Sequence, residues 1–435
     1  MRRRTVLATL TAATLIAANP APAAADPPGD GPLPGYTISN PPLAPALVDG
    51  RPSRVLQGVH EHAAYDIEVP PRWNGQLVTW AHGYRGASRV LTVEPPSYGL
   101  RQRLLDQGYA WAASSYYAND YDVRAGVLST HALTRHFARK VGNPRKTFIA
   151  GVSMGGHVTA RSIEEFPRTY DAALPMCGVV GDHALFDFFL DFQLVAQDLA
   201  DLPAYPPPPD YVTSVVPKIQ ERLGLNDPAG PNALGRQFRA IAVNRSGGDR
   251  PGAHAAFAYW QNFLFGLAEP APGDSLAQQP DRVATNVFTR YAPSTPVDVN
   301  RTVARVRPAD PGARHTRRLT AVPSIAGRPD VPVLSLHNLG DMFVPFSMEQ
   351  HYLKDVIRNR RGGNLVQRAI RNVGHCEFSP AEAGAAWDDL VRWERTGKRP
   401  AGDDVLRPSA PGYGCRFTDA TAYATGTRPL FARCP

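Results

Sequence analysis

The chain has 435 residues, of which 43% are hydrophobic, 20% charged and 9% aromatic. This composition is typical of globular proteins and excludes a wholly disordered, collagen-like or coiled-coil chain. At roughly 150 residues per domain, the length fits two domains or one large domain with an insertion. The formal net charge is +8. No dense block of Lys and Arg with interleaved aromatic residues is present, so we expect no nucleic-acid partner.

The first 25 residues are typical of an export signal. Arginines at 2–4 precede a small, apolar run at 5–18, and alanines at 23–25 form a cleavage site of the Ala-x-Ala type. The adjacent arginines leave both the general and the twin-arginine export routes open. A membrane anchor needs about 20 strongly apolar residues, and this run is shorter and rich in Ala and Thr. We therefore predict a signal peptide at 1–25, a secreted protein and no stable membrane insertion.

Downstream of the signal, apolar runs typical of strands alternate with helical patterns. The predicted strands are 64–69, 77–80, 109–113, 147–150, 172–176, 331–337 and 365–370. The predicted helices are 100–105, 127–141, 155–166, 348–358 and 380–396. Alternation of this kind predicts an α/β fold, with a mostly parallel central sheet and helices on both faces.

A segment of different character interrupts this alternation at 183–325. It opens with a cluster of phenylalanines, continues through a run of prolines at 206–209 and carries a second aromatic cluster at 257–265. We interpret it as an inserted, mainly helical cap between two parts of one core, 26–182 and 326–400. Residues 401–435 then form a C-terminal tail.

The strongest motif is Gly-Val-Ser-Met-Gly at 151–155, with the serine at position 153. It follows the strand at 147–150 and precedes a helix, and its glycines allow a sharp turn that holds a serine hydroxyl above the sheet. This context predicts that Ser153 is a nucleophile. The alternative is a tight glycine turn in which Ser153 only caps the helix.

In this context the motif resembles the α/β-hydrolase superfamily, and the resemblance covers 60–182 and 330–398. In that superfamily the acid and then the histidine follow the nucleophile along the chain, which implies Asp341 and His375 here. Asp182, after the strand at 172–176, is the competing acid, because some members place the acid there.

The resemblance also implies the role of each residue. His375 removes the proton from Ser153, and Asp341 holds the imidazole in the required tautomer. The backbone N–H of Met154 is one donor to the oxyanion. A His-Gly turn at 82–83 looks like that of the superfamily and assigns the N–H of Tyr84 as the second donor.

Four cysteines allow three disulfide pairings. Cys177 follows a predicted strand and Cys376 directly follows the histidine, so a bridge between them would tether the histidine loop. Cys415 and Cys434 both lie in the tail, which favours a second bridge there. The alternative for Cys177 is a small buried apolar side chain without a partner.

We expect an exported serine hydrolase that cleaves small-molecule or polymeric carboxylic esters through an acyl-enzyme. No metal-binding or nucleotide-binding motif is present, so we expect no metal and no cofactor. The aromatic run of the cap suggests that Phe189 and Phe192 bind substrate, although they could equally form the core of the cap.

Three alternatives stay open. A secreted peptidase or amidase of the prolyl-peptidase-like type shares the same residues, and acidic cap residues such as Asp187, Asp191 or Asp198 would then bind a free N-terminus. An acyltransferase differs only in releasing the acyl group to an alcohol. A non-catalytic binding protein of the same fold would not react with a fluorophosphonate.

Overall fold

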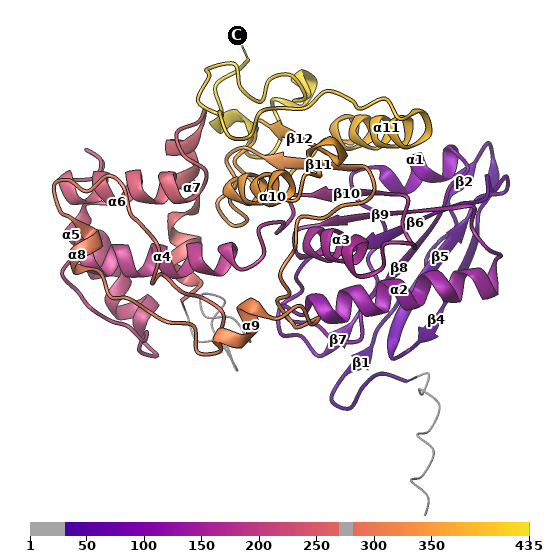
Figure 1. Cartoon of the computed structure of the whole chain (residues 1–435), viewed down its shortest axis with the longest axis horizontal. Coiled ribbons are helices and arrows are strands. Elements are labelled where there is room, and N and C mark those ends of the chain that lie inside the picture. Colours follow the sequence, from indigo (N-terminus) through magenta and orange to yellow (C-terminus); the bar gives the residue numbers. More distant parts are fainter. Residues whose placement is uncertain (1–30, 269–281, 435) are drawn as a thin grey trace, which may run out of the picture.

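The computed structural model describes residues 31–268 and 282–434, so the predicted signal peptide lies outside the described residues (Figure 1). Its centre is a sheet of eight strands in the order β12-β11-β10-β9-β6-β8-β5-β4. The strands are β4 (Arg54–His60), β5 (Ala63–Val69), β6 (Gln76–Ala81), β8 (Ala110–Ser114), β9 (Lys146–Val152), β10 (Ala172–Met176), β11 (Val333–Asn338) and β12 (Leu365–Ile370). The β4–β5 and β5–β8 pairs are antiparallel and the other pairs are parallel, so the predicted α/β fold with a mostly parallel sheet is confirmed.

Helices cover both faces of this sheet. On one face lie α2 (Val123–Lys140), α3 (Met154–Glu165) and α10 (Ser347–Arg358), and on the other α1 (Leu100–Asp106) and α11 (Pro380–Thr396) (Figure 1). The strands alternate between the two cores: in β9, Ile149 packs with α2 and α3, whereas Phe148 and Ala150 pack with α1 and α11. This is the period-2 alternation of a strand that is buried on both faces.

The edge of the sheet differs from the sequence prediction. Every residue of β5 is buried, the acidic Asp66 and Glu68 included. The carboxylate of Glu68 is buried, and two hydrogen bonds offset the cost of burying its charge. Arg101 Nε donates to it over 2.7 Å and Trp111 Nε1 over 2.9 Å. Strand β4, which the sequence patterns did not indicate, pairs with β5 and extends the sheet beyond it.

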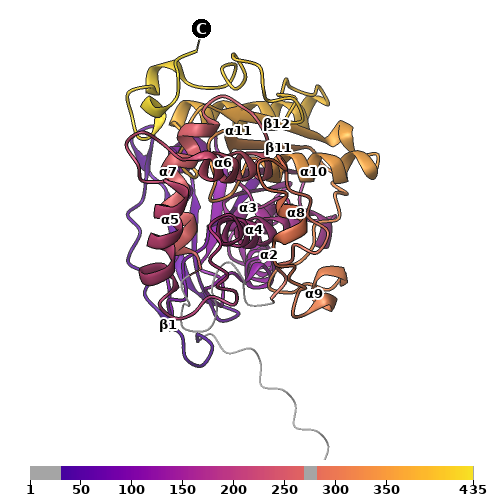
Figure 2. The same cartoon turned by 90° about the vertical axis from the view of Figure 1, so that its left-hand side faces the viewer.

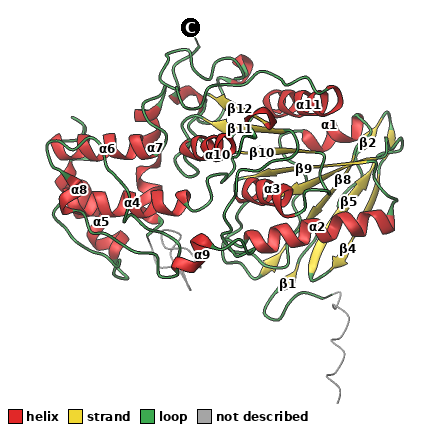
Figure 3. Cartoon of the chain, in the orientation of Figure 1, coloured by secondary structure: helices red, strands yellow, loops and turns green. Residues whose placement is uncertain are grey.

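Between β10 and β11 the described residues form helices and no strand. These helices lie together on one side of the sheet (Figures 1 and 3). They are α4 (Ala184–Leu199), a π-helical turn (Tyr211–Val215), α5 (Val216–Leu223), α6 (Ala233–Arg245), α7 (Ala253–Gly266), α8 (Val299–Thr302) and α9 (Pro311–His315). Seen from this side, α4 lies in the middle with other helices around it (Figure 2), which explains why it is apolar on nearly every face.

The remaining elements are short. Strand β1 (Thr37–Ile38) pairs with β7 (Val90–Leu91), and β2 (Leu47–Val48) pairs with β3 (Arg51–Pro52). Single 3-10 turns lie at Gly362–Asn364, Ala420–Ala422 and Arg428–Leu430. Within the described part of the chain, no helix has the length and apolar character that crossing a membrane requires.

Candidate active site

Ser153 lies at the sharp turn between β9 and α3. Its backbone has φ +56°, a value that non-glycine residues rarely adopt, and such strain is typical of a serine exposed on a strand-to-helix turn. The turn needs its glycines: a Cβ at Gly151 would lie 2.3 Å from the carbonyl oxygen of Gly155, and one at Gly155 would lie 2.0 Å from that of Ala81.

Three side chains from separate parts of the sheet meet at this turn. His375 Nε2 lies 2.8 Å from Ser153 Oγ, and His375 Nδ1 lies 2.6 Å from Asp341 Oδ2. Asp341 follows β11 and His375 follows β12, so the parallel strands bring both to the edge where Ser153 leaves β9. Serine, imidazole and carboxylate thus form a continuous chain of hydrogen bonds, which is the arrangement that activates a serine hydroxyl.

Asp341 is fully buried and its second oxygen is also bound. Its Oδ1 accepts the backbone N–H groups of Phe343 and Val344 over 2.9 and 3.0 Å, so the carboxylate is held with Oδ2 toward the imidazole. Asp182, the competing acid, is instead paired with its neighbour His183 and accepts the N–H of Ile325. The structure therefore places Asp341, not Asp182, against His375.

A cap residue that the sequence analysis did not single out supports the Asp341 loop. Arg250 is buried, and its Nε donates to the carbonyl of Leu339 over 2.7 Å. Burial lowers the pKa of Arg250 to about 10, while the charge of Asp341 opposes this shift. The guanidinium of Arg250 therefore supplies a positive charge close to the buried carboxylate of Asp341. No local motif marks Arg250, because its partner lies 89 residues away.

The two residues predicted to supply the oxyanion donors, Tyr84 and Met154, lie beside Ser153. Met154 is the first residue of α3, and the N–H groups in the first turn of a helix have no partner within the helix. Gly83, which precedes Tyr84, is packed against the serine: a Cβ there would lie 3.2 Å from Ser153 Cβ. Tyr84 lines the pocket beside Ser153, and burial raises the pKa of its hydroxyl.

A narrow apolar pocket lies beside Ser153. It is lined by Tyr84, Tyr121, Val179, Leu185, Phe186, Phe189, Phe343 and Val344. Its free volume is about 10 Å³, which is about the space that one water molecule needs. None of the described lining residues is charged.

The two cap phenylalanines predicted to bind substrate have different surroundings. Phe189 lines the pocket and stacks on Phe343, whose ring lies 5.0 Å from that of His375. Phe192 packs inside the cap instead, with its ring 4.8 Å from Phe238 and 5.0 Å from Phe265. Phe192 therefore belongs to the core of the cap and does not line the pocket.

The four cysteines form two disulfides, and no described cysteine is free. Cys177 is bonded to Cys376, next to the histidine, and Cys415 is bonded to Cys434 in the tail. Tyr98, which the sequence analysis did not select, donates to the carbonyl of Cys376 over 2.7 Å. The histidine loop is thus held by a covalent bond and by a hydrogen bond.

In residues 31–268 and 282–434, no group of three His, Cys, Asp or Glu side chains is arranged to hold a metal ion. His157 in α3 and His337 in β11 are buried, and each has polar partners outside the hydrogen-bond chain of the serine.

A serine at a strand-to-helix turn, followed along the chain by its acid and then its histidine, characterises the α/β-hydrolase fold. The sheet order and this turn give the chain the α/β-hydrolase fold. It is 22% identical to o-phthalyl amidase from Xanthobacter agilis, over 79% of this chain and 90% of that protein. No protein-family profile matches it.

Solved structures of similar fold include feruloyl esterase B from Aspergillus oryzae, with a TM-score of 0.40, 15% identity and coverage of 78% of this chain and 79% of that chain. Proline iminopeptidase from Mycobacterium smegmatis has a TM-score of 0.38 and 12% identity, and the match covers 80% of this chain and 100% of that chain.

Proposed function

We propose that the protein is an exported serine hydrolase that cleaves carboxylic esters through an acyl-enzyme. The observation that carries this proposal is the chain of hydrogen bonds that links Ser153 through His375 to the buried Asp341. The serine end of this chain lies beside an apolar pocket. The two disulfides support export, because disulfides persist in oxidising compartments outside the cytosol.

In this mechanism Ser153 Oγ attacks the ester carbonyl while its proton passes to His375 Nε2. The carbonyl oxygen becomes an oxyanion, which the N–H groups of Met154 and Tyr84 stabilise. When the tetrahedral intermediate collapses, the C–O bond to the alcohol breaks and His375 returns the proton to the leaving oxygen. Water then attacks the acyl-enzyme, and His375 takes a proton from the water. The C–O bond to Ser153 Oγ breaks, His375 returns the proton to Ser153 Oγ, and the acid leaves.

The pocket supports a neutral, aromatic or short aliphatic acyl group. Its described lining is aromatic and aliphatic, and no charged side chain is present there to pair with a charged acyl group. Burying an unpaired charge is costly, so we expect an uncharged benzoyl ester to be a better substrate than its analogue with a free ortho carboxylate.

The test is turnover by the mature protein of a p-nitrophenyl ester series of increasing acyl length, beside p-nitroanilides of the same acyl groups. We expect ester turnover with an optimum at short or aromatic acyl groups. Turnover of the anilides with little ester activity would reject the ester proposal. Absence of turnover together with absence of labelling by a fluorophosphonate would reject serine catalysis altogether.

Amide hydrolysis is the second candidate, because the relative from Xanthobacter agilis is named an amidase. The same residues perform it, with His375 protonating an amine as it leaves. Turnover of an aryl amide at a rate comparable to that of the ester with the same acyl group would favour this candidate.

Two of the phenylalanines of α4, Phe189 and Phe192, make the pocket testable. Phe189→Ala enlarges the pocket, so we expect kcat/KM for longer acyl chains to rise about tenfold relative to acetyl. Phe192→Ala is the matched control on the same helix. It leaves a cavity inside the cap, and we expect a stability loss of about 3 kcal/mol with the chain-length preference unchanged. Equal preference changes in both variants would contradict the proposed pocket.

A further inference from the structure

The loop that carries His375 connects β12 to α11, and the C-terminal tail lies against it. The tail is closed on itself by the disulfide between Cys415 and Cys434, whose Cα atoms lie 5.7 Å apart. We use "closed tail" for residues 415–434.

Thr427 of the closed tail contacts the backbone immediately before the histidine. Its Oγ1 accepts the N–H of Gly374 over 2.7 Å and lies 2.8 Å from Glu377 Oε2. The same hydroxyl is hydrogen-bonded to Asn372 Oδ1. In return, the N–H of Thr427 donates to Glu377 Oε1 over 2.9 Å. One tail residue thus contacts the loop on both sides of His375.

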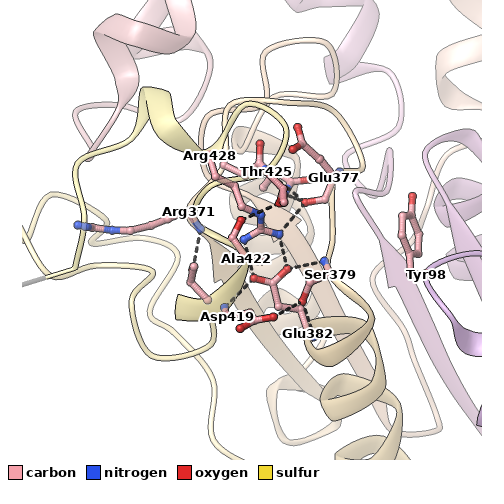
Figure 4. Close-up of polar contacts among 12 residues, drawn as sticks. Tyr98, Arg371, Glu377, Ser379, Glu382, Asp419, Ala422, Thr425 and Arg428 are labelled. Atoms are coloured by element: carbon pink, nitrogen blue, oxygen red, sulfur yellow. Dashed lines mark hydrogen bonds and ion pairs between the residues drawn. The ribbon is translucent and has the colours of Figure 1, made fainter.

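The neighbouring Arg428 anchors the closed tail to the start of α11. Its guanidinium donates to both carboxylate oxygens of Glu382, over 2.8 and 2.6 Å, and the two side chains are 2% and 1% exposed (Figure 4). Glu382 also accepts the N–H groups of Ser379 and Asp419 over 2.8 Å each. The carboxylate therefore joins the first turn of α11 to the tail.

A second anchor lies on the other side of the loop. Arg371, the first residue after β12, is buried, and its Nε donates to the carbonyl of Tyr413 over 2.9 Å. Its backbone N–H donates to Thr418 Oγ1 over 2.8 Å. The histidine loop is thus fixed to the tail at its beginning, beside His375 and at its end. Tyr98 lies apart from these contacts (Figure 4) and donates to the carbonyl of Cys376.

We propose that the closed tail is a positioning element for the general base, and that Thr427 is its positioning residue. This inference rests on the proposed function, because it assigns the imidazole of His375 as the base. Thr427 does not reach the reacting atoms. It orients the peptide between Val373 and Gly374, one residue before the histidine, and so sets where Nε2 lies relative to Ser153 Oγ.

The test compares Thr427→Val, which keeps the shape of the side chain but loses its hydrogen bonds, with Thr427→Ser, which keeps the hydroxyl. Thr425→Val is the matched control. Thr425 lies in the same tail, and its hydroxyl bonds only to the carbonyl of Ala422 in the hydrogen bonds of the described chain. For each variant, kcat and KM on a p-nitrophenyl ester and the midpoint of thermal unfolding are measured.

We expect Thr427→Val to lower kcat about tenfold, because small misplacements of catalytic groups cost up to about a hundredfold. KM should change less than twofold, and Thr427→Ser should restore most of kcat. Thr425→Val should match the wild type. A lower unfolding midpoint with unchanged kcat would overturn the proposal, as would an equal effect of Thr425→Val or a rise in KM alone.

A second measurement separates this inference from the proposed function. The Nδ1–H proton of His375, bound to Asp341, should give a downfield proton resonance in the wild type that Thr427→Val shifts or broadens. If the wild type proves inactive on every ester, this resonance still reports the position of the imidazole. An unchanged resonance in Thr427→Val would overturn the positioning role. If Thr427→Val does not fold, Thr427→Ala is measured in its place, with the same expected results.

Discussion

We expect the Ser153→Ala variant to lose ester turnover by about 10⁵- to 10⁶-fold in kcat, with folding unchanged. In the proposed mechanism Ser153 Oγ is the atom that forms the acyl-enzyme, and without it His375 has no proton to accept over its 2.8 Å contact. Residual catalysis of about 10³- to 10⁴-fold over water remains from the oxyanion donors and substrate binding.

This prediction is measured by p-nitrophenyl ester turnover and by labelling with a fluorophosphonate, followed by mass spectrometry of the modified peptide. Ser162→Ala is the control, because it makes the same chemical change in α3, in a buried residue away from His375. It should retain turnover and labelling. Activity in Ser153→Ala within about tenfold of the wild type would show that another residue is the nucleophile.

The second large effect is on stability. Arg428→Met should lower the free energy of unfolding by about 3 to 5 kcal/mol, because it leaves the carboxylate of Glu382 buried without its cation. The side chain of Glu382 is only 1% exposed, so water cannot replace the guanidinium. The measurement is urea unfolding followed by tryptophan fluorescence, with the disulfides intact.

Arg407→Met is the matched control in the tail, since Arg407 is 87% exposed and lies 3.9 Å from Asp404. We expect a change below about 0.5 kcal/mol there. Adding Glu382→Gln to Arg428→Met should recover part of the loss, because the unpaired buried charge is removed. A loss below about 1 kcal/mol in Arg428→Met would refute the role of this pair as an anchor.

The cap shows why sequence spacing did not decide which side chains line the pocket. Phe189 and Phe192 are three residues apart and lie on neighbouring parts of one helical face, so the sequence treated them alike. Helix α4 contacts different partners along its length: Phe189 meets Phe343 beside the histidine, whereas Phe192 meets aromatic rings of α6 and α7. Periodicity describes a face, but the partner of each residue depends on tertiary packing.

The residues that support the site were also missed, for a related reason. Arg250 and Thr427 are separated from their partners in the site by 89 and 53 residues. Tyr98 is 278 residues from the carbonyl that it contacts. Neither spacing nor residue type marks such contacts, because polar residues in loops are common and only the folded chain brings their partners within reach.

The sequence by itself determined the features that depend on local geometry. The glycines around Ser153 mark a sharp turn because only the absence of a Cβ permits its close backbone contacts, and the alternation of strands and helices indicated a parallel sheet. The resemblance to the α/β-hydrolase superfamily, with its order of nucleophile, acid and histidine, then implied Asp341 and His375. Only the tertiary structure decided how these residues are held, because the Arg250 contact, the narrow pocket and the closed tail all join segments distant in sequence, and such contacts exist only once the whole chain is packed.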